Sequence, residues 1–293
     1  MRAKRSVLDI VFDLFLYILM AIAFIVMVYP FLYVLNSSIS TVSKAKSPLL
    51  LLPAGVNFQS YVLLFKDSAM LRALLVSISR SVVGPIVMLF VTATGGYVIS
   101  RPHLIFGKFF RMFFLFTMYI SAGIIPVYLV IQSLHLTNTY WVYILPMAVS
   151  AFNMILVKTY IEALPTELEE AVLIDGGSEI DAYFRVILPI CLPVNAAILL
   201  FSAIQHWNSF IDTQLYNAMS TNLYTMQYLL FNTLAVQMQQ SLEEAKTRLA
   251  NNAISSQSLK MAITVVTVIP IMCVYPFLQK YFASGILVGS VKG

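Results

Sequence analysis

Long runs of residues without charge dominate this sequence. The 22 residues from Leu14 to Leu35 contain no Asp, Glu, Lys or Arg, and neither do the 46 residues from Met112 to Val157. A helix needs about 20 residues to cross the hydrocarbon core of a bilayer. Hydrophobic residues make up 60% of the chain and charged residues only 11%, against about 25% in a typical soluble protein. The chain is therefore expected to be an all-α integral membrane protein.

Polar segments divide the apolar runs into six expected spans. The 46-residue run is too long for one helix, and it divides at the polar segment 132–139. The expected spans cover residues 14–35, 74–100, 112–131, 140–157, 186–211 and 261–279. Residues 36–71 and 212–258 are expected to be outer loops, because they carry clustered polar and turn-forming residues. The domain prediction is a cytoplasmic N-terminus (1–13), a six-span transmembrane domain (14–280) and a cytoplasmic C-terminal tail (281–293).

Basic residues predict the orientation of these spans. Ten Lys and Arg residues fall on the side that holds both termini and the short loop 101–111, and seven fall on the other side, mostly in longer loops. Cytoplasmic loops are enriched in Lys and Arg, so both termini are expected in the cytoplasm. The net charge of +5 is attributed to this bias, and no nucleic-acid partner is expected.

Arg80 is the one charge expected within a span. Such a charge costs about 2.5–3.5 kcal/mol at the centre of a membrane helix, so it normally snorkels to the surface or faces a polar partner. Because Arg80 lies near the outer end of its span, it is expected to snorkel, or else to pair with substrate or with another subunit.

No pattern of residues points to a metal site or a catalytic centre. Cys191 and Cys273 lie in apolar runs, and His103, His135 and His206 are far apart without ligand spacing. The sequence shows no intramembrane pair of acids, and it lacks the charged rings of a channel. A membrane-embedded enzyme and a passive channel are therefore the less favoured alternatives, and no metal is expected.

The segment 165–189 is polar and acidic between strongly apolar runs. Thr166 and Glu169 have the spacing of a capping box, which predicts that a short helix begins there. Gly176 follows, and glycine readily takes the left-handed conformation that ends a helix, so this helix should end near Ile174.

A second helix is expected directly after this turn. Ser178 and Asp181 have the spacing of another capping pair, and Pro189 lies near the far end. The segment is therefore predicted to be a helical hairpin. Such a hairpin can lie in a groove on a partner protein, or it can be an ordinary polar loop between spans.

These residues resemble the EAA loop of permease subunits in binding-protein-dependent ABC importers. The matching positions are Glu170, Ala171, Asp175, Gly176, Phe184, Ile187, Leu188 and Pro189. Val172 and Gly177 stand where the usual pattern has alanine, two small changes expected to loosen the contact without removing it. The C-terminal stretch from Tyr275 to Gly293 is similar to the carbohydrate-uptake subgroup, as in the second permease of maltose-type importers.

The resemblance implies a fold, partners and a location. The fold is that of a type I ABC importer permease, with six transmembrane helices and a cytoplasmic EAA coupling hairpin, in the bacterial cytoplasmic (inner) membrane. The partners are a second and non-identical permease, two ATPase subunits, an extracytoplasmic solute-binding protein and a sugar or oligosaccharide. The chain has no phosphate-binding Gly-rich loop, so it is expected to bind no cofactor, with ATP and Mg held by the ATPases. The resemblance thus implies a transport subunit and not an enzyme.

The resemblance also assigns coupling residues. In the hairpin they are Glu169, Glu170, Ala171, Asp175, Gly176 and Gly177, and in the tail Gly289, Lys292 and Gly293. Glu170 is expected to anchor the hairpin electrostatically, Ala171 to permit close approach, and Gly176 to allow the turn.

The substrate path is less defined by the sequence. Candidate residues are Arg80, Asn153, Gln205, His206, Trp207 and Asn208. Aromatic rings and amide groups suit a polyhydroxylated ligand, although the aromatic residues at the outer end of span five can equally be interface anchors. An EAA-like loop indicates coupling to an ATPase and does not identify the transported solute. An importer of a non-sugar solute is therefore the main alternative.

Overall fold

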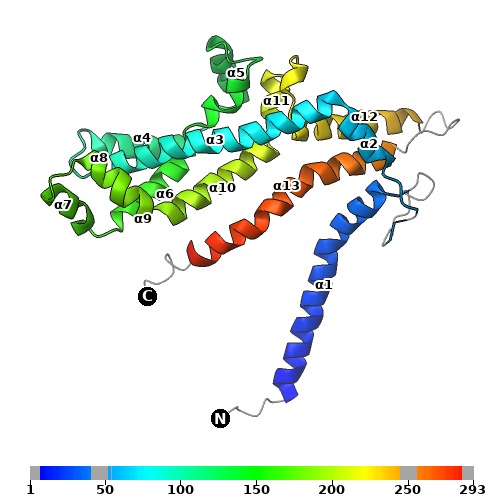
Figure 1. Cartoon of the computed structure of the whole chain (residues 1–293), viewed down its shortest axis with the longest axis horizontal. Coiled ribbons are helices and arrows are strands. Elements are labelled where there is room, and N and C mark those ends of the chain that lie inside the picture. The colour runs from blue at the N-terminus through cyan, green and yellow to red at the C-terminus, as the bar shows by residue number, and fades with distance from the viewer. Residues whose placement is uncertain (1–6, 41–51, 54, 245–255, 286–293) are drawn as a thin grey trace. The chain divides into compact units, whose positions relative to one another are not determined.

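The described part of the chain is built of helices (Figure 1). The computed structural model describes residues 7–40, 52–53, 55–244 and 256–285. Within these ranges there is no β-strand, only an isolated antiparallel bridge between Ser40 and Val56. The α-helices are α1 (Val7–Ser38), α2 (Gln59–Lys66), α3 (Ser68–Ser100), α4 (Gly107–Tyr119), α5 (Ile124–Ser133), α6 (Ala151–Glu162), α7 (Glu167–Ile174), α8 (Glu179–Ala182), α9 (Leu188–Ile190), α10 (Leu192–Asn208), α11 (Ile211–Tyr216), α12 (Met226–Glu244) and α13 (Ser256–Gly285). The tighter turns are the 3-10 helices η1 (Tyr140–Tyr143), η2 (Leu145–Met147) and η4 (Thr221–Leu223), and η3 (Tyr183–Ile187) is a π-helix.

The chain divides into two compact units. The first holds residues 1–67 and 233–269, and the second holds residues 68–232 and 270–293. In the first unit, the segment after α1 is held by the backbone hydrogen bond from Asn57 to Ile39 (2.8 Å) and by the hydroxyl pair of Ser38 and Tyr61 (2.7 Å). The second unit contains the 165–189 hairpin and is described below.

Two described helices are each long and apolar enough to cross a membrane alone. They are α1, from Leu8 to Ser38, and α3, from Ser68 to Ser100. These match the expected spans 14–35 and 74–100, with additional turns at the ends. Three bent helix pairs can each form one further span, so the described residues support up to five spans. The expected span 261–279 falls on α13, whose described apolar part, from Ser258 to Val274, is shorter than the helices counted above.

The expected span 112–131 is not one straight helix. Helices α4 and α5 are bent by 119° relative to each other. The chain between them is extended at Ile120 (ψ 117°) and turns at Gly123, whose φ of +81° is readily adopted only by glycine. The expected span therefore falls on a bent helix pair, and the uncharged Ser-Ala-Gly segment gave no sign of the break in a hydropathy pattern.

The expected spans 140–157 and 186–211 are bent as well. The first consists of η1, η2 and α6 with a bend of 43°, and Pro146 lies within η2. The second is bent by 74° between α9 and α10, where Pro193 occupies the first turn of α10. Proline lacks a backbone N–H and crowds the preceding turn, so it favours a helix start over a continuous helix.

Helix α3 is the axis of the second unit, with α6 and α10 packed against it (Figure 1). Glycines on α3 let these neighbours approach closely. A Cβ atom at Gly84 would lie 2.5 Å from the ring of His206 on α10, and one at Gly96 would lie 2.8 Å from the side chain of Val157 on α6. The helices are therefore fixed in register by contacts that tolerate no added methyl group.

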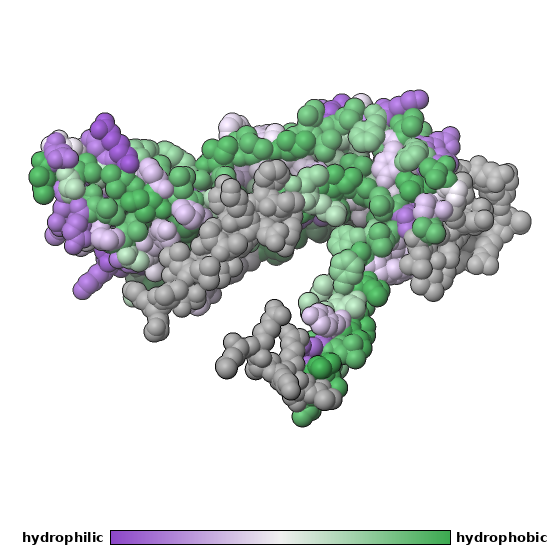
Figure 2. All heavy atoms as spheres, turned by 60° about the horizontal axis from the view of Figure 1, so that its bottom comes forward, coloured by the Kyte–Doolittle hydropathy of each residue, from purple (hydrophilic) through white to green (hydrophobic). Residues whose placement is uncertain are grey.

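Apolar side chains cover much of the described surface. Large hydrophobic residues are exposed along α1, α4 and α5, and none of the most apolar window of α1 is buried. Figure 2 shows hydrophobic surface along the body of the second unit, with hydrophilic side chains gathered at the end that carries α7 and α8. Exposed apolar surface of this extent fits lipid or partner subunits as its surroundings.

Candidate functional site

The segment 165–189 forms the predicted helix, turn and helix. Helix α7 ends at Ile174, as the glycine signal predicted. Gly176 has a φ of +83°, and the Gly177 N–H donates to the carbonyl of Val172 (2.9 Å), which closes the end of α7. A left-handed glycine that satisfies the last helical carbonyls is a common helix ending.

The predicted cap at the start of α7 was wrong. Thr166 has helical angles (φ −67°, ψ −25°) and its side chain makes no capping hydrogen bond. A capping side chain normally belongs to a residue in extended conformation. The Glu169 carboxylate, expected to complete the box, instead accepts hydrogen bonds from Arg101.

The predicted cap of α8 is confirmed. Ser178 is extended (φ −94°, ψ 168°), its hydroxyl accepts from the Asp181 N–H (3.2 Å), and the Asp181 carboxylate accepts from the Ser178 N–H (3.0 Å). Arg185 pairs with the same carboxylate at 3.1 Å. The start of α8 is thus fixed by reciprocal hydrogen bonds.

The N-termini of α7 and α8 should respond differently to loss of the Thr166 and Ser178 hydroxyls. Ser178→Ala removes a real N-cap and is expected to cost about 1 kcal/mol of local helix stability. Thr166→Ala, an equally exposed matched control, removes no cap and should stay within about 0.5 kcal/mol. Amide hydrogen exchange over residues 178–182 and 166–170 measures both, and equal protection losses in the two variants would contradict the assignment.

The second arm of the hairpin passes through an irregular turn. The π-helix η3 ends at Ile187, two positions before Pro189, which has no N–H for the normal helical hydrogen bond. Short π-helical turns recur at functional sites in proteins. The arm therefore leaves the hairpin with a local change of helical register.

Exposed apolar side chains surround the glycine turn. Ile174 is 84% exposed, Ile180 is 69% exposed, and Leu173 lies beside them. Of the predicted coupling residues, Glu170, Ala171, Asp175 and Gly176 are exposed, and Glu169 and Gly177 are half-buried. The tip of the hairpin thus exposes apolar side chains beside acidic ones. The remaining coupling candidates, Gly289, Lys292 and Gly293, lie outside the described residues.

Both arms of the hairpin contact α3 near its C-terminal end. The Tyr97 hydroxyl donates to the Glu179 carbonyl (3.1 Å), and its ring lies 4.6 Å from the ring of Tyr183. The Arg101 guanidinium lies 4.2 Å from the centre of the Tyr97 ring and binds both carboxylate oxygens of Glu169. The hairpin is thus attached to α3 through α7, α8 and η3.

Arg80 does not snorkel, which corrects the expectation from the sequence. Its side chain is fully buried and pairs with Asp212 on α11, one of the contacts being a 3.2 Å hydrogen bond. The guanidinium also lies 4.3 Å from the centre of the Tyr143 ring. Asp212 was missed because 132 residues separate it from Arg80, and no local pattern marks the pair.

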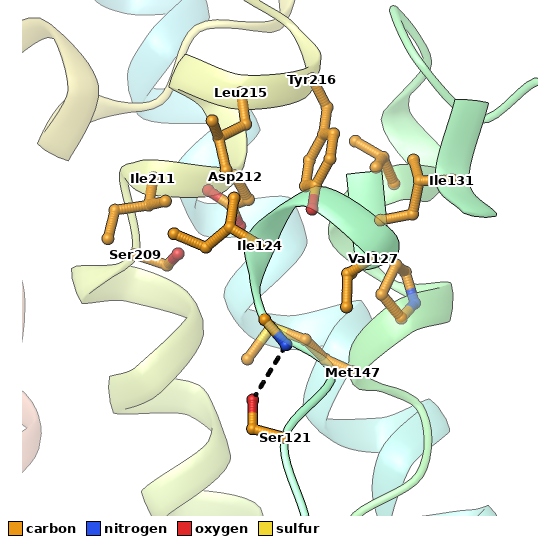
Figure 3. A pocket seen from close by; sticks show the side chains of 13 residues that line it. Ser121, Ile124, Val127, Ile131, Met147, Ser209, Ile211, Asp212, Leu215 and Tyr216 are labelled. Carbon is orange, nitrogen blue, oxygen red and sulfur yellow. Dashed lines mark hydrogen bonds between the residues drawn. The ribbon is translucent and has the colours of Figure 1, made fainter. Parts of the chain in front are cut away.

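Asp212 connects this buried pair to a pocket. The pocket has a volume of about 400 Å³ and lies between α5 and α11, with Asp212, Tyr216, Ile124 and Val127 on its walls (Figure 3). Asp212 remains 15% exposed at its side chain. The pocket is mostly apolar, with one carboxylate whose charge Arg80 balances.

The other predicted substrate-path residues do not line this pocket. Gln205 and Asn208 are exposed on α10, whereas His206 and Trp207 are buried. Asn153 is half-buried, and its amide lies 3.8 Å from the sulfur of Met88. The structure therefore places the Gln205 and Asn208 amides at the surface and His206 and Trp207 in the interior. Among the described residues, no group of three or more His, Cys, Asp or Glu side chains is arranged to hold a metal.

Comparison with known proteins identifies the chain as a transport subunit. Residues 95–288 match the family described as binding-protein-dependent transport system inner membrane component. The chain is 36% identical over 285 residues to the polygalacturonan/rhamnogalacturonan transport system permease protein YtcP of Bacillus subtilis, covering 96% of this chain and 98% of that one. It is 39% identical over 268 residues to protein LplC of the same organism, covering 91% and 90%.

A solved structure has the same fold. It is a chain from the crystal structure of a bacterial ABC transporter involved in the import of the acidic polysaccharide alginate, with a TM-score of 0.85, 27% identity, and coverage of 96% of this chain and 99% of that chain. The chain therefore belongs to the binding-protein-dependent transport system inner membrane components, and it is a permease subunit of an ABC importer.

Proposed function

We propose that this permease imports oligosaccharides, with acidic saccharides as the first class to test. The observation that carries the proposal is the near full-length similarity to YtcP, named for polygalacturonan/rhamnogalacturonan transport. The alginate importer structure supports the same substrate class. A cargo other than a sugar is the second candidate, because the coupling hairpin by itself does not select a solute.

In this proposal the hairpin 165–189 is the coupling element. The exposed apolar tip formed by Leu173, Ile174 and Ile180 enters a groove on an ATPase subunit, with Glu170 providing an electrostatic anchor. The small side chain of Ala171 permits close approach, and the left-handed Gly176 turns the chain. ATP and Mg are held by two ATPase subunits, whose closure moves the docked hairpin as a rigid body.

The topology of the proposal places six spans across the bacterial inner membrane. Both termini and the hairpin lie in the cytoplasm, and a second, non-identical permease pairs with this chain around the transport path. An extracytoplasmic solute-binding protein delivers the saccharide. The excess of Lys and Arg on the side of the termini and the family membership support this arrangement.

Two regions are candidates for the saccharide path. Gln205 and Asn208 are three positions apart on α10 and exposed, so their amides share one helix face. The α5–α11 pocket offers the Asp212 carboxylate beside apolar walls. Amides, carboxylates and apolar surface together suit sugar hydroxyls and ring faces.

ATPase assays on the reconstituted complex test the substrate class. The complex, with its binding protein, is expected to hydrolyse ATP severalfold faster with oligogalacturonides or alginate oligomers than with peptides or phosphorylated polyols. Stimulation by a non-sugar solute alone would overturn the saccharide assignment. Transport that persists without ATP would indicate a channel, and activity of the chain purified alone would indicate an enzyme.

A further inference from the structure

Arg101 binds the first arm of the hairpin with a two-point contact. Its two terminal nitrogens donate to the two carboxylate oxygens of Glu169, one of these bonds being 2.9 Å long. The planar guanidinium matches a carboxylate in this geometry, which fixes direction as well as distance. Both side chains are only about one-fifth exposed, so the pair is partly shielded from solvent.

The guanidinium of Arg101 is itself held in place by α3 and α4. It lies over the Tyr97 ring, and its Nε donates to the Tyr97 carbonyl (3.4 Å) and to the Ser100 hydroxyl (3.3 Å). Arg111 of α4 donates to the Arg101 carbonyl at 3.2 Å. Arg101 is therefore not a free surface side chain that happens to meet a carboxylate.

Tyr97, which lies under the Arg101 guanidinium, also contacts the second arm of the hairpin. It is 7% exposed, donates to the Glu179 carbonyl and packs on the Tyr183 ring. The hydroxyls of Tyr183 and Thr94 lie 3.3 Å apart. The last two turns of α3, together with Arg101 directly after them, thus contact the hairpin on both sides of Gly176.

Helix α3 runs on from this point without interruption to Arg80. Arg80 and Ser100, the last residue of α3, are 20 positions apart, which is about 30 Å at about 1.5 Å per residue. At the far end Arg80 is bound to Asp212, which lines the α5–α11 pocket. A displacement of the hairpin that the Arg101 contact transmits to α3 would therefore reach the pocket through one helix.

We propose that the clamp formed by Arg101, Glu169 and Tyr97 is the positioning element that transmits hairpin movement to α3. This inference rests on the proposed coupling function of the hairpin and assigns Glu169 a role inside the chain. Glu170 and the tip dock on the ATPase, whereas Glu169 is part of the clamp within this chain. Docking and transmission are therefore separate functions of adjacent residues.

Charge-removing and charge-exchange variants of the assembled importer test the proposal. Arg101→Gln and Glu169→Gln each are expected to leave the ATPase subunits bound and to reduce transport per ATP hydrolysed at least fivefold. The exchange Arg101→Glu with Glu169→Arg restores opposite charges and is expected to recover at least half of the coupling. Lys158→Gln is the matched control, because it breaks the Lys158–Glu162 pair within α6, and coupling should be unchanged.

The readout separates a positioning role from a structural one. A merely structural pair would lower the yield of assembled complex but leave transport per ATP unchanged in each complex. Normal coupling in both single variants, or an exchange variant no better than the singles, would overturn the clamp. Gly176→Arg reports on docking in the same assay, so a Gly176→Arg complex with wild-type assembly and wild-type transport contradicts the proposed docking function instead.

Discussion

Replacing Gly176 by arginine is expected to reduce transport at least tenfold and to release the ATPase subunits during purification. A non-glycine residue in the left-handed conformation costs about 1–2 kcal/mol, and Gly176 has a φ of +83°. No atom of the described residues lies within 4 Å of a Cβ built at Gly176, so this subunit leaves open space for the start of an arginine side chain. In the proposed complex it would meet the ATPase at the hairpin tip. Quantitative co-purification and transport in vesicles measure the effect.

Gly176→Asn is the matched control for backbone strain. Asparagine tolerates the left-handed conformation and has a short side chain. This variant is expected to keep the ATPase bound and to retain most of the transport. Gly176→Arg with wild-type assembly and wild-type transport would show that the hairpin tip is not a docking surface.

Asp212→Ala is expected to be the most destabilising single change in the second unit. It leaves the Arg80 charge fully buried without its carboxylate, and loss of one partner of a buried pair costs about 3–5 kcal/mol. The variant should show a lower thermal unfolding temperature in detergent and a lower yield in membranes.

The double variant Arg80→Met with Asp212→Leu separates charge from shape. It removes both charges and keeps apolar volume, and such replacements are often neutral or stabilising. It is expected to unfold at a higher temperature than Asp212→Ala. If Asp212→Ala unfolds at the wild-type temperature, Arg80 has another counter-charge. The Arg80–Asp212 pair would then not be what stabilises the buried guanidinium.

Local chain signals predicted the features that depend on local conformation. The end of α7 at Ile174, the Ser178–Asp181 cap and the end of α3 at Ser100 all follow from residues within one or two turns. Helix caps and glycine turns depend on residues close together in sequence, so they can be predicted from the sequence alone. The expected cap at Thr166 failed because Arg101, 68 residues away from Glu169, binds the carboxylate that the cap required.

Features that depend on distant contacts could not be predicted. The Arg80–Asp212 pair, the contact of Tyr97 with Glu179 and the fit of His206 against Gly84 join segments 82 to 132 residues apart. Their side chains are common in spans or loops and carry no spacing that marks a partner. The 119° break after α4 was missed for another reason, since hydropathy treats Ser121 and Gly123 as part of an uncharged run.

Crosslinking from the hairpin tip tests the central claim most directly. The claim is that the 165–189 hairpin contacts an ATPase subunit. A photoreactive probe is attached to Cys in Ile174→Cys, in a background with Cys273→Ser, and the native Cys191 is buried. Ile125→Cys on α5 is the matched control, since Ile125 is 74% exposed and Ile174 is 84% exposed. The account predicts an ATPase adduct from position 174 and none from position 125, whereas no adduct from position 174, or equal adducts from both, would contradict it.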